Sequence, residues 1–367
     1  MELLNDEFYM RLALNAAAGA AGQTGINPMV GCVVVNDGRI VGIGAHLKRG
    51  EGHAEVHALN MAGDNARGAA AYVTLEPCSH HGRTPPCSDR LIREGVKRVV
   101  VAAMDPNPAV AGRGLEKLRA AGIDVEVGLL GEQSRKLNEA FNKYIVTGIP
   151  FVTIKTALTL DGRIATKTGS SKWITGPAAR EAVHTLRHRH NAIMVGVGTV
   201  LADDPELTTR LSVPGLHPVR VVVDSMLRIP DHARVLNGEA RTIVLTTAQA
   251  QAARIEAVQA AGAEVIVCGD GPRVDLRAAL EELGKREIGS VLVEGGGVLN
   301  GSLLKAGLVD KLMLFYAPKL VGGAAPSGFE FDGPEAMSGA LQLENVTIER
   351  YGGDWCVTGY PAAGREG

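Results

Sequence analysis

The feature that most constrains how this chain can fold is a set of metal-binding side chains in its N-terminal part. His53 stands at the predicted start of a helix, Cys78 directly follows a predicted strand, and Cys87 opens another predicted helix. One imidazole and two thiolates are typical ligands of Zn²⁺, and three protein ligands leave its fourth tetrahedral position open. The fold therefore has to bring one strand end and two helix starts together around a single ion.

Glu55 adds a carboxylate that such a site does not need as a ligand. The pattern His-x-Glu followed by Pro-Cys is typical of zinc-dependent hydrolytic deaminases. In these enzymes the metal lowers the pKa of a bound water and the glutamate transfers protons. Their usual pattern is P-C-x-x-C, whereas here eight residues separate Cys78 from Cys87. A core histidine beside two buried thiols, or a redox disulfide, would leave this placement unexplained, and a non-enzymatic zinc module would need a fourth protein ligand.

The composition argues against several classes of protein. The chain has 367 residues, 46% hydrophobic and 21% charged, which predicts two domains with ordinary cores. A net charge of −2 disfavours a nucleic-acid partner, which usually recruits a basic surface. No apolar run is long enough to span a membrane, no signal-peptide pattern opens the sequence, and the five scattered cysteines are unlike a disulfide scaffold. We expect a cytoplasmic protein with neither nucleic acid nor membrane as a partner.

Strand and helix patterns alternate through the N-terminal part, which favours an α/β layer sandwich. We expect strands at 30–35, 40–45, 70–75, 96–103 and 125–129, and helices at 5–21, 53–61, 87–93, 114–121 and 131–148. The last helix runs into Gly148 and Pro150. Glycine followed by proline is typical of a helix end, so we place a domain boundary there, between 1–147 and 148–367.

A second α/β series follows the boundary and shows no metal-binding pattern. We expect its strands at 151–158, 192–197, 219–223, 242–246, 264–267, 290–293 and 311–317, its helices at 177–189, 249–261, 275–284 and 297–306, and a closing hairpin at 344–351 and 354–360. Residues 294–302 join a buried strand to a helix through three glycines. Bare backbone N–H groups there would suit a pyrophosphate. The signal is weak by itself, and it is not the G-x-G-x-x-G of a standard dinucleotide-binding fold.

Two segments of the first part match one known family. Residues 78–87 read C-S-H-H-G-R-T-P-P-C, and residues 27–35 read N-P-M-V-G-C-V-V-V. In both segments the chain resembles the bifunctional deaminase–reductases of riboflavin biosynthesis, which carry this long loop where other members of the cytidine-deaminase superfamily have two residues. The resemblance implies a cytidine-deaminase-like α/β/α sandwich, with Asn27 at the pyrimidine edge of the substrate and Cys32 in the core.

The loop between the two cysteines also offers donors for an anion. The substrate of this family carries a ribose 5-phosphate, which His80, His81 and Arg83 could bind. Alternatively, these residues only solvate a surface loop. Either histidine could compete as a zinc ligand, but Cys87 is the softer donor and opens a helix. We therefore keep Cys87 as a ligand of one zinc ion per chain, and assign His80 and Arg83 to the deaminase substrate.

The second half is similar to the reductase domain of the same family. The matching segments read K-T-A-L-T-L-D-G-R-I-A at 155–165, S-S-K-W-I at 170–174 and G-V-G-T-V-L-A-D-D-P at 196–205. The resemblance implies a dihydrofolate-reductase-like α/β domain that binds NADPH, and the two resemblances together cover essentially the whole chain. The implied cofactor contacts are Ala157, Trp173, Thr199, Asp203, Ser225, Gly296, Gly297, Val298, Leu299, Asn300, Gly301 and Ser302.

The resemblance also implies a set of residues that face the reductase substrate: Lys155, Ser171, Arg187, Leu207, Arg210 and Glu294. Arginine suits a sugar phosphate because it can bind through two parallel hydrogen bonds, and a glutamate can accept from a ring N–H. Some of these residues have simpler explanations. Arg187 lies at a basic helix end and could complement the helix dipole, and Trp173 could be core packing. Arg228 could bind the 2′-phosphate that distinguishes NADP from NAD.

The resemblance therefore implies two successive reactions. The first is zinc-dependent hydrolytic deamination of 2,5-diamino-6-(5-phosphoribosylamino)pyrimidin-4-one, and the second is reduction of its ribosyl group to ribityl by NADPH. One alternative is a nucleoside or tRNA deaminase fused to an unrelated or degenerate reductase-like domain. Another is a protein with a single activity. The sequence leaves the oligomeric state open, with a homo-oligomer as one possibility.

Overall fold

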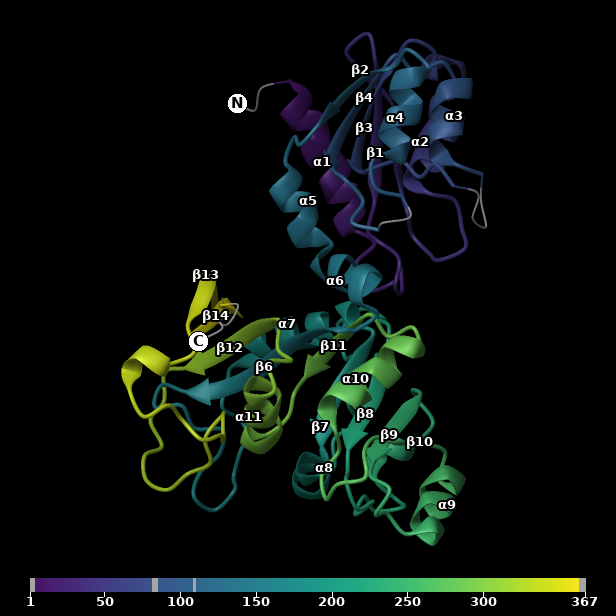
Figure 1. Cartoon of the computed structure of the whole chain (residues 1–367). Helices are drawn as coiled ribbons and strands as arrows, with labels where there is room; N and C mark the ends of the chain where they lie inside the picture. Colours follow the sequence, from purple (N-terminus) through teal and green to yellow (C-terminus); the bar gives the residue numbers. More distant parts are fainter. Residues whose placement is uncertain (1–3, 81–84, 108–109, 363–367) are drawn as a thin grey trace. The chain divides into compact units, whose positions relative to one another are not determined.

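The computed structural model describes residues 4–80, 85–107 and 110–362. The chain divides into two compact units, Met1–Gly148 and Ile149–Gly367, which are described separately (Figure 1). Among the described residues, no helix is both long enough and apolar enough to cross a lipid bilayer.

The first unit is built on a five-stranded sheet with the strand order β2-β1-β3-β4-β5. Its strands are β1 (Gly31–Asn36), β2 (Arg39–Ala45), β3 (Ala70–Leu75), β4 (Arg98–Ala103) and β5 (Asp124–Val127). Strand β1 pairs antiparallel with β2 and β3, whereas β3, β4 and β5 run parallel. The carboxyl ends of β3 and β4 therefore meet at one edge of the sheet, where polar side chains can gather.

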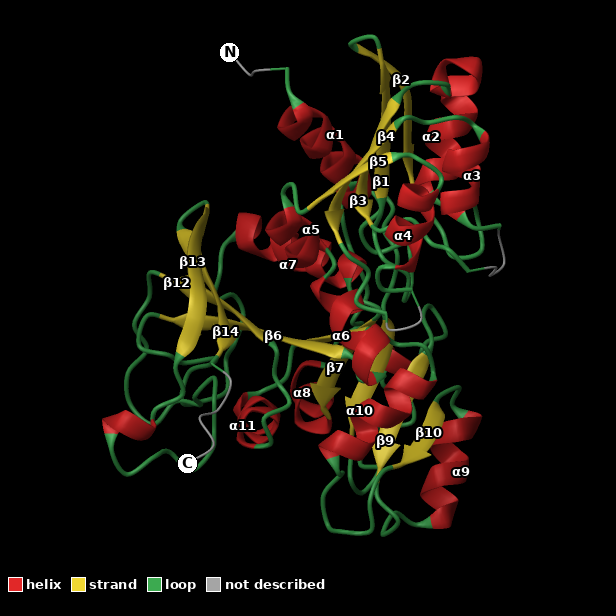
Figure 2. Cartoon of the chain, turned by 45° about the horizontal axis from the view of Figure 1, so that its top comes forward, coloured by secondary structure: helices red, strands yellow, loops and turns green. Residues whose placement is uncertain are grey.

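Helices cover both faces of this sheet (Figure 2). They are α1 (Asp6–Ala18), α2 (Ala54–Ala62), α3 (Cys87–Arg93), α4 (Arg113–Ala120), α5 (Gly131–Leu137) and α6 (Glu139–Thr147), with a short 3₁₀ turn at Gly63–Ala66. Side chains alternate between the faces of a strand, so Val33 packs with Met10 of α1 while Val34 packs with Leu59 of α2. The expected α/β/α sandwich is confirmed.

The expected single helix over 131–148 is wrong, because the structure breaks it at Asn138 into α5 and α6. The Asn138 side chain accepts a hydrogen bond from the Met29 N–H at 2.8 Å and donates one to the Met29 carbonyl at 2.9 Å. This buried amide thus pairs with a distant backbone segment, which fixes Asn138 outside the helical conformation. The partner lies 109 residues away, so local periodicity could not reveal it.

The second unit contains a nine-stranded sheet with the order β10-β9-β8-β7-β11-β6-β12-β14-β13. Its strands are β6 (Phe151–Thr159), β7 (Ala192–Gly196), β8 (Val219–Val223), β9 (Thr242–Thr246), β10 (Glu264–Val267), β11 (Ser290–Val293), β12 (Lys311–Ala317), β13 (Leu343–Tyr351) and β14 (Asp354–Pro361). All pairs from β10 to β12 are parallel, and the closing hairpin β13–β14 adds to β12 antiparallel. The mostly parallel α/β sheet matches the expectation.

The helices of this unit also lie on both faces of its sheet. They are α7 (Pro177–Arg189), α8 (Val197–Asp203), α9 (Ala252–Ala260), α10 (Leu276–Lys285) and α11 (Gly297–Lys305), with 3₁₀ turns at Arg234–Leu236 and Met337–Gly339. Helices α10 and α11 share one apolar core, whereas α8 and α9 share another that takes the alternate residues of the same strands. Helix α7 packs on Phe315 and Cys356.

Helix α8 corrects the expected strand over 192–197, because the strand ends at Gly196 and Val197 begins the helix. Helix α8 has only seven residues and contains a glycine, which gives little helical signal in a sequence. Its position directly after β7 places its first turn at the carboxyl edge of the parallel sheet. In open α/β sheets, ligands usually bind at that edge.

Candidate active sites

The candidate metal ligands come together in the first unit as the sequence predicts. His53 is the N-cap of α2, Cys78 lies in the loop after β3, and Cys87 is the first residue of α3. The Nδ1 atom of His53 lies 3.5 Å from Sγ of Cys78 and 3.3 Å from Sγ of Cys87. In the described part of the chain, this is the group of ligand atoms that could hold a metal ion, all within 4.8 Å of one another.

The spacing of these atoms fits zinc. With Zn–S of about 2.3 Å and Zn–N of about 2.1 Å, tetrahedral angles place a ligating nitrogen and sulfur about 3.6 Å apart. The Cys87 backbone N–H also donates to Sγ of Cys78 at 3.3 Å. Hydrogen bonds from Cys87 and His53 outweigh burial and lower the pKa of Cys78 to about 4. A thiolate is the form that binds metal, so the donor set suits a three-ligand zinc site.

Glu55 lies in the first turn of α2 and is 3% exposed. Burial, reinforced by the nearby Cys78 thiolate, raises the pKa of Glu55 to about 7. Glu55 lines the same cavity as His53 and Cys78, and that cavity has a volume of about 300 Å³. The carboxylate is therefore placed beside the candidate metal site but outside its ligand set.

Asn27 lines this cavity together with His46, a residue that the sequence analysis missed. Nδ1 of His46 lies 3.2 Å from the Gly52 carbonyl, so it carries the proton, and Nε2 accepts from the Asn27 amide at 3.1 Å. This arrangement fixes which way the Asn27 amide faces. The ring of His46 also contacts that of His53 edge to face, with centroids 5.4 Å apart.

The loop residues divide into those that the structure describes and those that it does not. His80 lines the cavity, whereas His81 and Arg83 lie outside the described residues. Glu76 and Asp105 also line it and were missed. They follow β3 and β4, so the parallel pairing of these strands was the signal that could have identified them.

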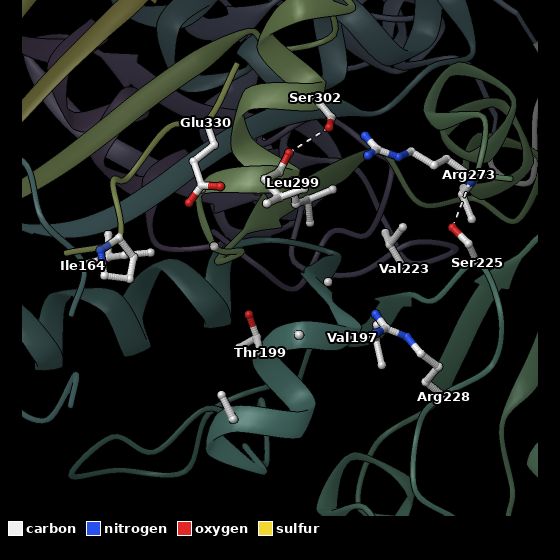
Figure 3. A pocket seen from close by; sticks show the side chains of 18 of the residues that line it. Ile164, Val197, Thr199, Val223, Ser225, Arg228, Arg273, Leu299, Ser302 and Glu330 are labelled. Atoms are coloured by element: carbon white, nitrogen blue, oxygen red, sulfur yellow. Dashed lines mark hydrogen bonds between the residues drawn. The ribbon is translucent and has the colours of Figure 1, made fainter. Parts of the chain in front are cut away.

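The second unit holds a cavity of about 900 Å³ at the carboxyl ends of β7, β8 and β11 (Figure 3). It is lined by most residues predicted to bind the cofactor and by Ser171: Ser171, Thr199, Asp203, Ser225, Gly296, Gly297, Val298, Leu299 and Ser302. The N-terminus of α11 opens onto it, which suits an anion. A Cβ atom at Gly297 would lie 2.4 Å from the Ser327 carbonyl oxygen, so only glycine fits. The cavity and this helix start suit a dinucleotide.

Four predicted cofactor residues do not line this cavity: Ala157, Trp173, Asn300 and Gly301. The Asn300 amide donates to the carbonyls of Gly295 and Gly328, so it supports the glycine turn from behind. Trp173 is 64% exposed, with the Arg180 guanidinium 4.6 Å from its ring centroid. Core packing is therefore wrong as an explanation of Trp173.

Two charged residues of the cavity wall were missed by the sequence analysis, Arg273 and Glu330. Arg228 and Arg273 extend from two loops on either side of Ser225 (Figure 3). The Ser225 hydroxyl accepts from the Val274 N–H at 3.1 Å and so ties these loops together. Arg273 follows a glycine-rich turn after β10, and a basic residue at such a strand end was the missed signal.

A buried ion triad joins three of the predicted substrate residues. Arg187 Nε and Nη2 donate to the two Glu294 carboxylate oxygens at 2.6 and 3.0 Å, and Lys155 Nζ lies 3.5 Å from Oε2. The three side chains are only 10–14% exposed. Burial by itself would raise the pKa of Glu294. The positive charges of Arg187 and Lys155 have the larger effect, and the pKa falls to about 2. Glu294 is therefore ionised. The guanidinium of Arg187 binds this carboxylate and does not extend into a cavity where a phosphate could bind it.

The remaining predicted substrate residues lie on the coil between α8 and β8 or close to α8. Leu207 is 3% exposed and has a positive φ of 54°. Arg210 is 56% exposed at its side chain and pairs with Glu206 at 3.0 Å. The Ser171 hydroxyl lies 3.5 Å from an Asp203 carboxylate oxygen.

Comparison with known proteins assigns a family model to each part of the chain. Residues 4–103 match the cytidine and deoxycytidylate deaminase zinc-binding region, and residues 150–357 match the RibD C-terminal domain. The riboflavin biosynthesis protein RibD of Bacillus amyloliquefaciens is 46% identical over 364 residues, covering 99% of this chain and 98% of the relative. RibD of Escherichia coli is 44% identical, covering 96% and 99%.

Solved structures give the same result. Acinetobacter baumannii RibD superposes with a TM-score of 0.89 at 38% identity, covering 98% of this chain and 99% of that one. A diaminohydroxyphosphoribosylaminopyrimidine deaminase/5-amino-6-(5-phosphoribosylamino)uracil reductase from Thermotoga maritima superposes with a TM-score of 0.86 at 38% identity, covering 97% and 99%. Both matches extend over both units.

Proposed function

The chain belongs to the RibD family of bifunctional deaminase–reductases in riboflavin biosynthesis, and we propose that its two cavities catalyse the two reactions in succession. Residues 1–147 form the deaminase and residues 148–367 the reductase. The observation that carries the first assignment is the position of Glu55 in one cavity with His53 and Cys78. No nucleic acid or membrane takes part, and the free state of its five cysteines suits the cytoplasm.

In the deaminase, the substrate is 2,5-diamino-6-(5-phosphoribosylamino)pyrimidin-4-one. Zinc on His53, Cys78 and Cys87 would supply a water of lowered pKa. Glu55 would take a proton from the attacking water and pass it to the 2-amino group. The water oxygen then stays on the ring carbon as a carbonyl oxygen, the C–N bond breaks and ammonia leaves. Asn27, with its amide oriented by His46, binds the pyrimidine edge. His80 and Arg83 bind the sugar phosphate.

In the reductase, bound NADPH would supply the hydride that converts the ribosyl group to ribityl. The start of α11, with Gly296 and Gly297, would hold the pyrophosphate of the cofactor. Arg210 faces the sugar phosphate of the substrate, while Lys155 and Glu294 face its pyrimidine ring. Because the chain holds donor and acceptor in one geometry, positioning contributes most of the rate acceleration.

Removal of zinc separates the two activities and tests this assignment. We expect a chelator to reduce ammonia release to background while NADPH oxidation with the deaminated intermediate is unchanged, because all three proposed ligands belong to one of two compact units. Metal content by atomic absorption should be one zinc per chain before treatment, and zinc addition should restore ammonia release. Loss of both activities on chelation would contradict the assignment of deamination to the first unit and reduction to the second.

Arg228 and Arg273 are expected to select NADPH over NADH. Asp224 follows β8, where many NAD enzymes place an acid on the ribose 2′-hydroxyl, but here it is fully buried and accepts the Ile229 N–H at 2.8 Å. Two exposed guanidinium groups instead border the cavity. Glutamine at either position should lower the affinity for NADPH about tenfold or more, which is the effect of losing one charge-assisted hydrogen bond.

This selectivity is measured most directly with 2′,5′-ADP and 5′-ADP in binding calorimetry. Either arginine variant should lose affinity for 2′,5′-ADP and keep its affinity for 5′-ADP. Arg277→Gln is the matched control, because Arg277 lies on the exposed side of α10 and does not line the cavity. An equal loss for both nucleotides would refute the 2′-phosphate role.

A further inference from the structure

The coil between α8 and β8 is held in place by side chains rather than by strand pairing. Its residues 207–216, the substrate segment, form no helix or strand, yet Leu207, Thr208 and Thr209 are 3–5% exposed. A buried coil needs hydrogen-bond partners for its backbone groups. For this segment, several of those partners are imidazoles.

Three histidines accept hydrogen bonds from backbone N–H groups of the substrate segment. The Arg210 N–H donates to Nδ1 of His184 at 3.2 Å, the Thr209 N–H to Nδ1 of His217 at 3.2 Å, and the Leu216 N–H to Nδ1 of His188 at 2.9 Å. His184 and His188 are four residues apart on α7, so they lie on the same face of the helix. One face of α7 thus binds the substrate segment at two positions, Arg210 and Leu216.

These contacts define the protonation state of the rings. A backbone N–H can only donate, so each Nδ1 must be unprotonated, and a neutral ring then carries its proton on Nε2. Burial and the positive charges of Arg187 and Arg210 lower the pKa of His184 to about 4. The His184 ring is therefore neutral near pH 7 and available as an acceptor.

Arg187 adds a fourth contact to the same stretch of backbone. Its Nη1 donates to the Thr208 carbonyl at 2.9 Å, while its other two donors hold Glu294. The segment also folds back on itself, because a Cβ atom at Gly215 would lie 2.9 Å from Cγ2 of Thr209. Residues 208–210 are thereby fixed relative to the buried triad, with the exposed Arg210 side chain extending from the fixed end.

We propose that His184, supported by His217 and His188, is a positioning residue of the reductase that holds the backbone of Arg210 so that its guanidinium meets the sugar phosphate of the substrate. None of the three histidines lines the cofactor cavity, so they act through the substrate segment. The inference rests on the proposed assignment of Arg210 to that phosphate.

Two substitutions of His184 test the proposal. His184→Ala removes the acceptor, and we expect the KM for the deaminated intermediate to rise about tenfold, the usual loss for an N–H left without its partner. The KM for NADPH and the deaminase rate should not change. In His184→Asn, a side-chain oxygen can replace Nδ1 as the acceptor, so most of the affinity should return. His232→Ala, an exposed imidazole of the same unit, is the matched control.

Arg210→Gln separates the failure of this inference from the failure of the assignment beneath it. If Arg210→Gln leaves the KM for the intermediate unchanged, the assignment of Arg210 is wrong. If Arg210→Gln raises it but His184→Ala does not, or if His184→Asn is as impaired as His184→Ala, the positioning role is refuted. The double variant His184→Ala/Arg210→Gln should have the same KM for the intermediate as Arg210→Gln alone, because the two changes affect one contact.

A second pair of variants covers the case in which His184→Ala does not fold. His217→Ala and His217→Asn repeat the comparison at the Thr209 N–H, which lies next to Arg210 in the chain. The alanine variant should again raise the KM for the intermediate, and the asparagine variant should restore it. Equal values for these two variants would overturn the proposal.

Discussion

Replacement of Glu55 by glutamine is expected to slow ammonia release by about 10²–10⁴-fold, the usual contribution of a positioned general acid–base group, while one zinc per chain is retained. Glutamine keeps the size of the side chain but cannot take up and pass on a proton. Glu55 lies outside the candidate ligand cluster of His53, Cys78 and Cys87, so all three ligands remain in the variant and zinc should still bind. The reaction is followed by ammonia release, and zinc by atomic absorption.

The reductase provides an internal control for this variant. NADPH oxidation with the deaminated intermediate should match that of the unmodified protein, which shows that the chain is folded. Glu116→Gln removes a similar charge from the exposed face of α4 and should leave ammonia release unchanged. Full deaminase activity of Glu55→Gln with zinc retained would show that another group transfers the protons, and loss of zinc would place Glu55 among the groups that hold the metal.

The candidate zinc site could be predicted because each ligand is marked by a local pattern. His53 starts a helix, Cys78 follows a strand, and Cys87 starts a helix, and these boundaries can be read from a few neighbouring residues. The unusual interval between the cysteines added family information, because the sequence of residues 78–87 resembles the loop of one family. The alternating α/β order of both units depends on the same local signals, and most expected strands begin and end within two residues of the observed ones.

What could not be predicted depends on contacts between residues far apart in the sequence. The break at Asn138 needs Met29, and the partner of Arg187 is Glu294, 107 residues away. The family resemblance implied that the guanidinium of Arg187 faces a phosphate. The spacing of residues does not reveal that a carboxylate, Glu294, folds against it instead. Arg273 differs from these two, because its place after a glycine-rich turn at the end of β10 was a local signal. Only its position beside the cofactor cavity depends on the order of the parallel strands.

Replacement of Glu294 by glutamine is expected to abolish reduction and to lower the free energy of unfolding of the second unit by about 3 kcal/mol or more. Glu294 is the shared carboxylate partner of Arg187 and Lys155, whose side chains are 12% and 14% exposed. Without the carboxylate, two cations remain buried side by side with no anion. Both tryptophans of the chain, Trp173 and Trp355, lie in this unit, so their fluorescence in a urea titration reports on its unfolding alone, and ammonia release checks the first unit.

Two further measurements show whether charge causes this loss. Arg187→Met in the Glu294→Gln background removes one unpaired cation and should recover part of the stability but none of the reduction. The dependence on pH has a definite sign: because the folded unit lowers the pKa of Glu294 from 4.5 to about 2, this carboxylate stabilises the fold fully above pH 4.5 and progressively less as the pH falls toward 2. The difference in stability between the unmodified protein and Glu294→Gln should therefore be constant from pH 5 to 8 and shrink below that range. A difference that does not change with pH in the acidic range would mean that Glu294 contributes through packing rather than through its charge.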